Sequence, residues 1–262
     1  MKEKIKGVIL DWAGVTIDFG CFAQATVLME VFKKQGIDIT AKEARDAMGL
    51  GKKDHIKAIL NMKRIENLWK KKHGRKFTDK NVDELHDEFD SELMSILPNY
   101  TYLIDGVSEV VKTLKKNKIK IGSTSSYTKD VLEMVVRDTE IKGYSPDFVA
   151  SVDDAGHGCP YPYMIFKNMQ ELSLPSVKSV IKLSSTADGI KEGVNAGVIS
   201  VGVIAGSNEM GLTYSEYKAL SKEKKKAASD KIRDTFKKAG ANYVIKDITK
   251  LPALIEKISK TK

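Results

Sequence analysis

The stretch GVILDWAGVTID (residues 7–18) decides how the chain is expected to fold. Its first residues, Gly7 to Leu10, form a short apolar run that ends at Asp11, and a turn containing Gly14 follows. A compact run of this kind is typical of a strand that is buried on both faces of a parallel sheet. Asp11 then lies at the carboxyl end of the strand, which is the edge where such sheets place their sites.

Similar runs recur along the rest of the chain, and most are followed by a helical pattern. The predicted strands lie at 118–123, 148–152, 179–183, 198–204 and 243–245, and the predicted helices at 107–116, 128–139, 162–172, 188–196, 215–238 and 251–258. This alternation predicts βαβ units, and therefore an α/β fold around a parallel sheet. Polar residues follow the strands at 123–126, 153–154 and 184–185, where we expect them to share one edge.

Residues 20–100 do not follow this alternation of strands and helices, because they contain helical patterns but no convincing strand. The predicted helices are 22–35, 41–48, 53–69 and 81–97. We expect a helical cap domain of residues 20–100, inserted into an α/β core domain of residues 1–19 and 101–262, above the catalytic edge of the sheet. An apolar stripe in the first cap helix suits packing inside the cap or pairing of two copies: Phe22, Ala25, Leu28, Met29 and Phe32.

Charge and cysteine content narrow the class of protein. The chain has 44 Lys and Arg against 35 Asp and Glu, and the net charge of +9 is spread along the sequence. We therefore expect a small anionic substrate and no nucleic acid. Cys21 and Cys159 are too few for a disulfide framework. The N-terminus does not read as a signal peptide and no run is long enough for a membrane span, so we expect a cytoplasmic protein with no membrane partner.

Asp11 is the main candidate for chemistry. Its carboxylate and the backbone N–H groups of the Gly14 turn are expected at the same point. A carboxylate beside amides that hold developing negative charge suits nucleophilic attack on phosphorus. An Asp at this place also suits the capping of a turn, and this segment alone leaves both interpretations open.

Several longer stretches carry a resemblance to a known family. They are VILDWAGVTIDFGCFA (8–23), ITAKEARDAMGLGKKDHIKAI (39–59), IKIGSTSSYT (119–128), PDFVASVDD (146–154), PYPYM (160–164), KEGVNAG (191–197) and VGVIAGSNEMGLT (201–213). Through them nearly the whole chain resembles the phosphonoacetaldehyde hydrolase (phosphonatase) family of the haloacid dehalogenase superfamily. The resemblance implies a small phosphonate substrate, with water converting phosphonoacetaldehyde to acetaldehyde and phosphate.

The resemblance assigns the two reacting groups. Asp11 becomes the nucleophile, and Lys52 in the cap becomes the amine that forms an imine with the aldehyde, so that the C–P bond breaks to an enamine. Such a lysine needs a lowered pKa, and His55, three positions on, is the candidate proton shuttle. Ala13 stands where most phosphatases of the superfamily have a second Asp, which protonates an alkoxide. A carbon leaving group does not need that acid in the same way.

The resemblance also implies binding residues, a metal and an assembly. The expected substrate- and phosphate-binding residues are Ala13, Gly14, Cys21, Met48, Ser125, Ser126 and Tyr127. Mg²⁺ is expected on Asp11 and the Ala13 carbonyl, with Asp188 as the candidate third ligand. Family members pair through their cap helices, so a homodimer is expected.

Four positions depart from the family pattern and leave the activity open. Cys159 replaces the cation of the third motif, Ser185 and Gly189 replace the two acids of the fourth, and Val15 replaces a Thr. The first hypothesis is a working Mg²⁺-dependent phosphonatase. The second is a catalytically impaired or inactive relative that binds a ligand or partner. Ala13 argues against a third hypothesis, a general phosphatase.

Overall fold

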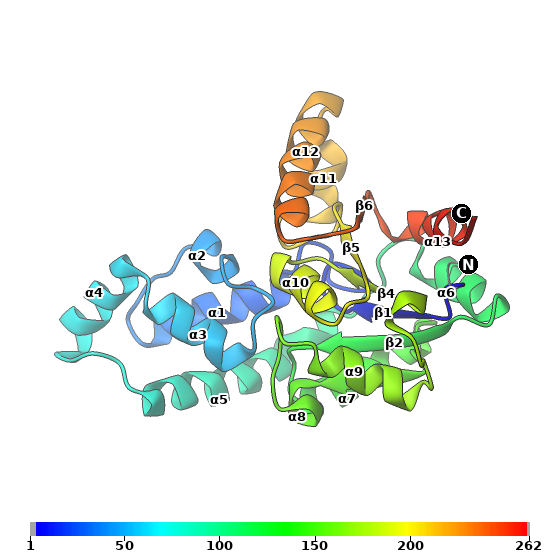
Figure 1. Cartoon of the computed structure of the whole chain (residues 1–262). Coiled ribbons are helices and arrows are strands. Elements are labelled where there is room, and N and C mark those ends of the chain that lie inside the picture. Colours follow the sequence, from blue (N-terminus) through cyan, green and yellow to red (C-terminus); the bar gives the residue numbers. More distant parts are fainter. Residues whose placement is uncertain (1–3, 261–262) are drawn as a thin grey trace.

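A computed structural model describes residues 4–260, where six strands form one parallel sheet in the order β3-β2-β1-β4-β5-β6 (Figure 1). Residues 1–3 and 261–262 lie outside the described residues. The first three belong to the N-terminal stretch in which no signal peptide was predicted. The strands are β1 (Gly7–Asp11), β2 (Lys120–Ser125), β3 (Phe148–Ser151), β4 (Val180–Ser184), β5 (Ile199–Val203) and β6 (Tyr243–Ile245). The predicted α/β fold with a parallel sheet is confirmed.

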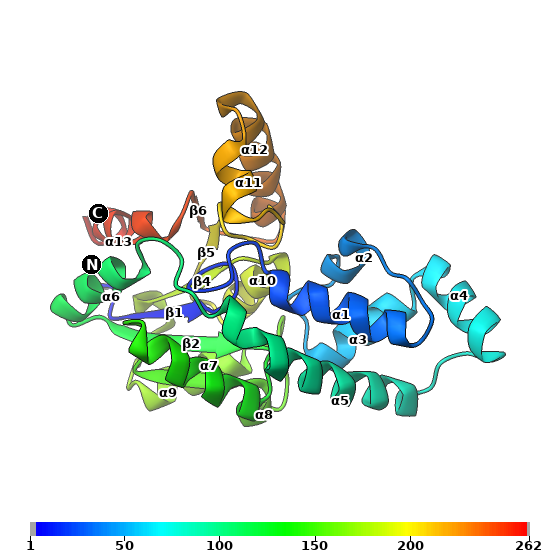
Figure 2. The ribbon, with the colours of Figure 1, turned by 180° about the vertical axis from the view of Figure 1, so that it is seen from behind.

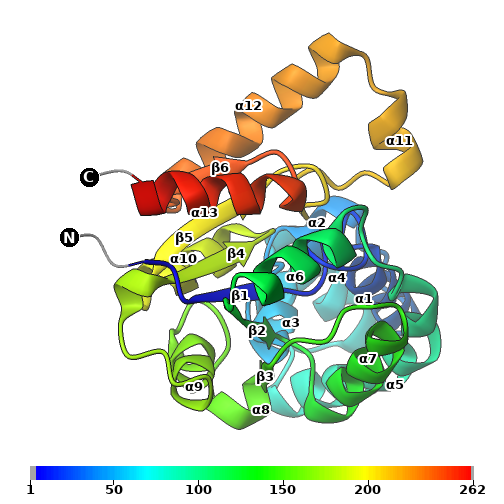
Figure 3. The same cartoon turned by 90° about the vertical axis from the view of Figure 1, so that its right-hand side faces the viewer.

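The central strand β1 is covered on both faces by helices (Figure 3). Val8 and Leu10 belong to an apolar core that includes residues of α6, α7 and α13, whereas Ile9 packs with residues of α9. This alternation follows from the two-residue period of a strand. The helices of this part are α6 (Val107–Lys116), α7 (Lys129–Ile141), α8 (Val152–Ala155), α9 (Tyr163–Glu171), α10 (Ala187–Asn195), α11 (Tyr214–Ala219), α12 (Lys222–Lys238) and α13 (Leu251–Lys260), with 3₁₀ turns at Val177–Ser179 and Ile248–Lys250.

The chain between β1 and β2 is helical and lies to one side of the sheet (Figure 2). Its elements are α1 (Phe22–Lys34), α2 (Ala41–Arg45), α3 (Lys52–Leu60), α4 (Lys63–His73), α5 (Asp79–Ile96) and a 3₁₀ turn at Leu97–Tyr100. The first helix is fixed at its start by Asp18, whose carboxylate accepts hydrogen bonds from the backbone N–H groups of Phe22 and Ala23 at 2.9 and 3.0 Å. A carboxylate suits a helix N-terminus because the first N–H groups lack partners in the helix.

Two helices predicted as continuous are broken in the structure, so these two predictions were wrong. Residues 53–69 divide into α3 and α4, because Met62 adopts an extended conformation. Residues 215–238 divide into α11 and α12, where Ser221 is extended and its hydroxyl accepts from the backbone N–H of Lys224. In addition, the helix predicted at 41–48 ends at Arg45.

The apolar stripe of α1 is used inside the chain. Ala25, Leu28 and Phe32 are all buried, and α1 packs against α5. Phe22 and Met29 are half-buried, so most of the stripe is used within the chain, and the homodimer stays a prediction. No helix within residues 4–260 combines the length and apolar character needed to cross a membrane.

Asn168 fastens α9 to the strand that leads into the site. Its Oδ1 accepts from the Ser123 N–H at 3.1 Å, and its Nδ2 donates to the carbonyls of Ser123 and Met164, both at 2.9 Å. A Cβ at Gly122 would lie 2.2 Å from Oδ1, so this close approach requires glycine. The amide thus fixes how α9 lies on β2.

We expect Asn168→Ala to lower the free energy of unfolding by about 2–4 kcal/mol, because it strips partners from buried polar groups of β2. Urea unfolding measures the change. Asn117→Ala is the matched control, since the exposed Asn117 amide bonds only to a carbonyl of its own helix. Equal effects of the two substitutions would contradict this role of Asn168.

Candidate active site

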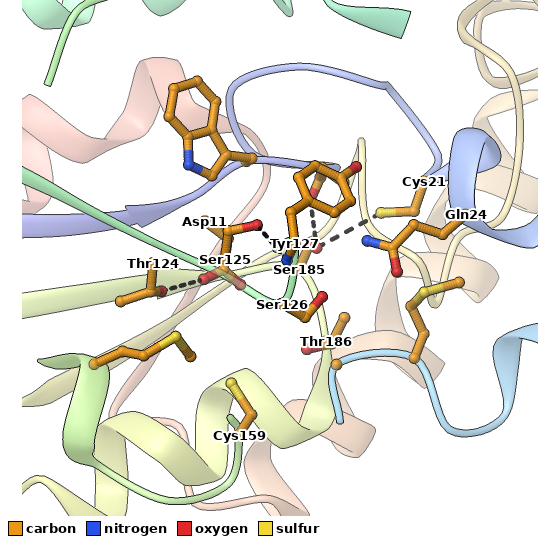
Figure 4. A pocket seen from close by; sticks show the side chains of 15 residues that line it. Asp11, Cys21, Gln24, Thr124, Ser125, Ser126, Tyr127, Cys159, Ser185 and Thr186 are labelled. Carbon is orange, nitrogen blue, oxygen red and sulfur yellow. Dashed lines mark hydrogen bonds between the residues drawn. The ribbon is translucent and has the colours of Figure 1, made fainter. Parts of the chain in front are cut away.

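A pocket opens at the carboxyl ends of β1 and β2 and is lined by residues of both the core and the cap (Figure 4). Many of the residues predicted to bind substrate meet there: Asp11, Ala13, Cys21, Met48, Ser125, Ser126 and Tyr127. Gln24, Gly49, Thr124, Cys159, Ser185 and Thr186 also contribute to its wall. The pocket therefore joins the first motif, the end of β2 and the loop after β4 in one place.

The cap closes over the pocket through the loop before α3. Leu50 of this loop forms an isolated β-bridge with Cys159. Gly49 has a φ of +110°, and a Cβ there would lie 2.6 Å from the Thr186 hydroxyl. Glycine is needed at 49 both for its backbone conformation and for this close approach. The cap loop consequently lies directly on the loop that follows β4.

Some predicted residues do not reach the pocket. The Gly14 N–H is bonded to the carbonyl of Ile17 at 2.8 Å, so Gly14 shapes the turn behind the wall. Asp188 forms an ion pair with Lys191 at 2.8 Å and is not part of the pocket wall. Asp153, one of the polar residues expected after β3, accepts from the backbone N–H of Lys129. His157 also lies outside the pocket wall, against the rings of Tyr161 and Tyr163.

The Asp11 carboxylate is held by partners that the sequence analysis did not identify. Its Oδ1 lies 2.5 Å from Lys182 Nζ and accepts a second hydrogen bond from the Thr124 hydroxyl at 3.2 Å. Its Oδ2 accepts a hydrogen bond from the Ser184 hydroxyl at 2.6 Å. Both oxygens therefore have donors before any ligand binds.

Lys182 places a positive charge beside Asp11. It stands beside Ile9 in the register of β1 with β4, and two residues before Ser184, so both side chains point to the same face as Asp11. Its ammonium also lies 2.9 Å from Glu192 of α10 and contacts the Thr124 hydroxyl. Burial lowers the pKa of Lys182, but the carboxylates of Asp11 and Glu192 outweigh it, and the pKa is raised.

A signal for Lys182 was present in the sequence. It interrupts the apolar run SVIKL (179–183), and a lysine is almost never fully buried unless it is paired. The strand prediction placed this lysine inside the sheet, yet no partner for it could be named. Asp11 is far from Lys182 in the sequence, and Glu192 lies on the helix that follows β4, so both meet the lysine only in the fold.

The two serines of the altered fourth motif bond to the first motif. Ser184 bonds to Asp11, and the Ser185 hydroxyl donates to the Ala13 carbonyl at 2.8 Å. The Cys21 sulfur lies 3.7 Å from the Ser185 oxygen and packs beside it. The Ala13 carbonyl, predicted as a metal ligand, thus accepts a hydrogen bond from the protein itself.

This donor set does not fit Mg²⁺, which prefers an octahedron of carboxylate, carbonyl and water oxygens. Asp11 is the only carboxylate among the described residues that line the pocket. The Lys182 ammonium already stands at one of its oxygens, and Ser185 occupies the Ala13 carbonyl. Across residues 4–260, no three His, Cys, Asp or Glu side chains are grouped so as to hold a metal ion.

Lys52, which the family resemblance predicts as the second reacting group, is buried in the cap and is not among the residues that line the pocket. Its side chain is 4% exposed, and its Nζ donates to Gln24 Oε1 at 2.6 Å. The ammonium also lies 4.6 Å from the centre of the Phe89 ring. Burial lowers the pKa of Lys52 to about 7, and Asp90 opposes this only in part. Gln24 lines the pocket, so the Gln24 side chain lies between the Lys52 amine and the pocket.

The His55 ring presents an acceptor nitrogen to Lys52. Its Nε2 lies 2.9 Å from the Ala44 carbonyl, which can only accept, so Nε2 carries the hydrogen. Nδ1 is then a free acceptor, 3.2 Å from Lys52 Nζ. Burial, and next the charge of Lys52, hold the pKa of His55 well below its usual value. The ring is therefore neutral at physiological pH.

Comparisons with known proteins identify the family of the chain. The family model for haloacid dehalogenase-like hydrolases matches residues 5–197. A phosphonoacetaldehyde hydrolase of Bacillus cereus is 43% identical over 257 residues, which cover 98% of this chain and 97% of that protein. A bifunctional phosphonoacetaldehyde hydrolase/aminoethylphosphonate transaminase of Clostridioides difficile is 44% identical, and the chain spans 40% of its length.

A solved structure has the same fold as this chain. The crystal structure of a phosphonoacetaldehyde hydrolase-like protein from Oleispira antarctica has a TM-score of 0.97 and is 33% identical, covering 99% of this chain and 94% of that one. The chain therefore belongs to the haloacid dehalogenase-like hydrolases, within the branch that contains the phosphonoacetaldehyde hydrolases.

The lowered pKa of Lys52 predicts a particular pH dependence of stability. Below pH 7 the folded protein must bury an ammonium, whereas between about pH 7 and pH 10 the unfolded chain binds the extra proton, so stability rises with pH. We expect Lys52→Met to be more stable than the unchanged protein by about 1–3 kcal/mol at neutral pH, with the difference shrinking as the pH approaches about 10.

Urea unfolding of both proteins across this range measures the difference. Lys53→Met is the matched control, because Lys53 is exposed and pairs with Asp83 on the surface. A difference between Lys52→Met and the unchanged protein that stays constant with pH would show that the amine is not perturbed by burial.

Proposed function

We propose that the chain is a phosphonoacetaldehyde hydrolase-type enzyme, which converts phosphonoacetaldehyde and water to acetaldehyde and phosphate. The observation that carries the proposal is the buried Lys52 amine. Its pKa of about 7, the acceptor nitrogen of His55 beside it and its place next to the pocket suit imine formation at neutral pH. A general phosphatase has no use for such an amine.

In the first step, Lys52 attacks the aldehyde carbon. The amine passes a proton to Nδ1 of His55, which returns it to the carbinolamine hydroxyl, and this oxygen then leaves as water to give an iminium. For this the Lys52 side chain leaves Gln24 and turns into the pocket. The aldehyde end of the substrate then lies toward Gln24 and Met48, and the phosphonate end toward Asp11 and Ser126.

In the second step, the Asp11 carboxylate attacks phosphorus. The electron pair of the C–P bond moves into the iminium, which becomes a neutral enamine, and an aspartyl phosphate forms. Water then cleaves the aspartyl phosphate to phosphate. Protonation of the enamine carbon and hydrolysis of the iminium release acetaldehyde and restore Lys52. The hydroxyls and backbone at Ser125 and Ser126 are the candidate donors to the phosphonate oxygens.

One observation favours a second candidate, a relative that binds the aldehyde but transfers no phosphoryl group. Both oxygens of Asp11 and the Ala13 carbonyl already have donors from the protein. In that case, Lys52 would form the imine and Asp11 would not react. The two candidates therefore share the first step and differ in the second.

Borohydride reduction separates the two candidates. With phosphonoacetaldehyde present, we expect irreversible trapping at Lys52, found by peptide mass mapping, together with phosphate release in the unreduced reaction. Lys52→Met is expected to abolish both signals, whereas Lys53→Met retains both. Trapping without phosphate release would select the second candidate, and absence of trapping at Lys52 would exclude both.

His55→Gln tests the proton transfer. Loss of the acceptor Nδ1 is expected to slow imine formation about 10²–10⁴-fold, the usual contribution of a general base. The rate of borohydride trapping measures this step without depending on phosphate release. His157→Gln serves as the control, because His157 lies outside the pocket wall. An unchanged trapping rate in His55→Gln would refute the role of His55.

A further inference from the structure

The altered motifs form a connected set around Asp11. Three acceptor atoms face the point where a cation was expected, and each bonds to a donor of the protein. Asp11 Oδ1 is held by Lys182 at 2.5 Å, Asp11 Oδ2 by Ser184 at 2.6 Å, and the Ala13 carbonyl by Ser185 at 2.8 Å. An ammonium and two hydroxyls thus take the place of the bonds that a divalent cation would make.

The Ser184 hydroxyl is sterically tied to the replacement at 189. A Cβ at Gly189 would lie 2.1 Å from Ser184 Oγ and 3.1 Å from Asp11 Oδ2. An acidic side chain at 189 and the Ser184 hydroxyl therefore compete for the same space beside Asp11. The loss of the acid at 189 is thus the condition that lets Ser184 bond to the nucleophile.

Lys182 cannot move away to admit a metal ion. Its side chain is fully buried, and its ammonium is held between Asp11, Glu192 and the Thr124 hydroxyl. A divalent cation on Asp11 would be placed within a few ångströms of this fixed charge, in surroundings that screen charges poorly. The ammonium both satisfies Asp11 and repels its usual partner.

We propose that Lys182, Ser184 and Ser185 are a built-in substitute for the divalent cation, so that Asp11 acts on its phosphonate without a metal. Lys182 is a positioning residue: it contacts the nucleophile, holds one of its oxygens and leaves the substrate to the pocket residues. This inference rests on the proposed function for its substrate, but its statement about Mg²⁺ concerns the protein alone.

The first test uses the unchanged protein. Thermal unfolding in millimolar MgCl₂ and in EDTA is expected to give the same midpoint, and phosphate release from phosphonoacetaldehyde is expected to be the same in both. A midpoint that Mg²⁺ raises, or phosphate release that EDTA abolishes and Mg²⁺ restores, would overturn the inference. Asp188→Asn is expected to change neither result, because Asp188 pairs with Lys191 away from the pocket.

The second test converts the site. The reference variant is Lys182→Met/Glu192→Gln, which removes both members of the buried pair and leaves no lone charge. We expect it to release phosphate about 10²–10³-fold more slowly, with or without Mg²⁺. Adding Ser184→Gly, Ser185→Asp and Gly189→Asp to it is expected to create a protein whose unfolding midpoint and phosphate release both rise with Mg²⁺.

Circular dichroism establishes that each variant is folded. A folded converted variant whose midpoint ignores Mg²⁺ would refute the claim that these residues exclude the metal. If the converted variant does not fold, the unchanged protein in MgCl₂ and EDTA still decides the question.

Trapping at Lys52 separates failure of this inference from failure of the proposed function. Normal trapping with Mg²⁺-dependent phosphate release would overturn the inference and keep the proposed function. Trapping without phosphate release under any condition would reject phosphoryl transfer, while an unfolding midpoint that ignores Mg²⁺ would still support exclusion of the metal.

Discussion

The ammonium of Lys182 joins three strands and a helix at the place where the chemistry is expected. Its partners come from β1, β2 and α10, and it rises from β4 itself. A buried lysine is tolerated only when it is paired. The pairing therefore constrains how these elements meet, and it determines the electrostatic surroundings of Asp11 before any ligand arrives.

Two lysines of this protein show how partners, and not burial alone, decide the charge. Both Lys52 and Lys182 are almost completely buried, and burial lowers the pKa of each. Lys182 contacts two carboxylates, and they raise its pKa, whereas Lys52 contacts an amide oxygen and a neutral ring nitrogen. One amine is thus kept charged, whereas the pKa of the other is lowered to about 7, in one molecule.

The departures from the family pattern look like losses when each position is considered alone. In the structure, Ser184, Ser185 and Gly189 lie against Asp11 or Ala13, and Lys182 completes the set. At the altered fourth motif, the acceptor atoms of Asp11 and Ala13 thus receive hydrogen bonds from the protein itself. The orientation of the Asp11 carboxylate is therefore fixed by Lys182 and Ser184.

The sequence by itself determined the parallel α/β fold and the place of Asp11 at the end of a strand, because strand periodicity and strand ends are local features of the chain. Residues such as Met48 and Cys21 came only from the family resemblance. Local backbone geometry, which composition does not encode, decided three further features. The helical segment is interrupted at Met62, Asp188 forms an ion pair with Lys191, and Gly14 lies in a turn outside the pocket wall. The partners of Lys182 were decided by the tertiary structure alone, because Asp11, Thr124 and Glu192 are brought to one strand end only when the sheet is assembled.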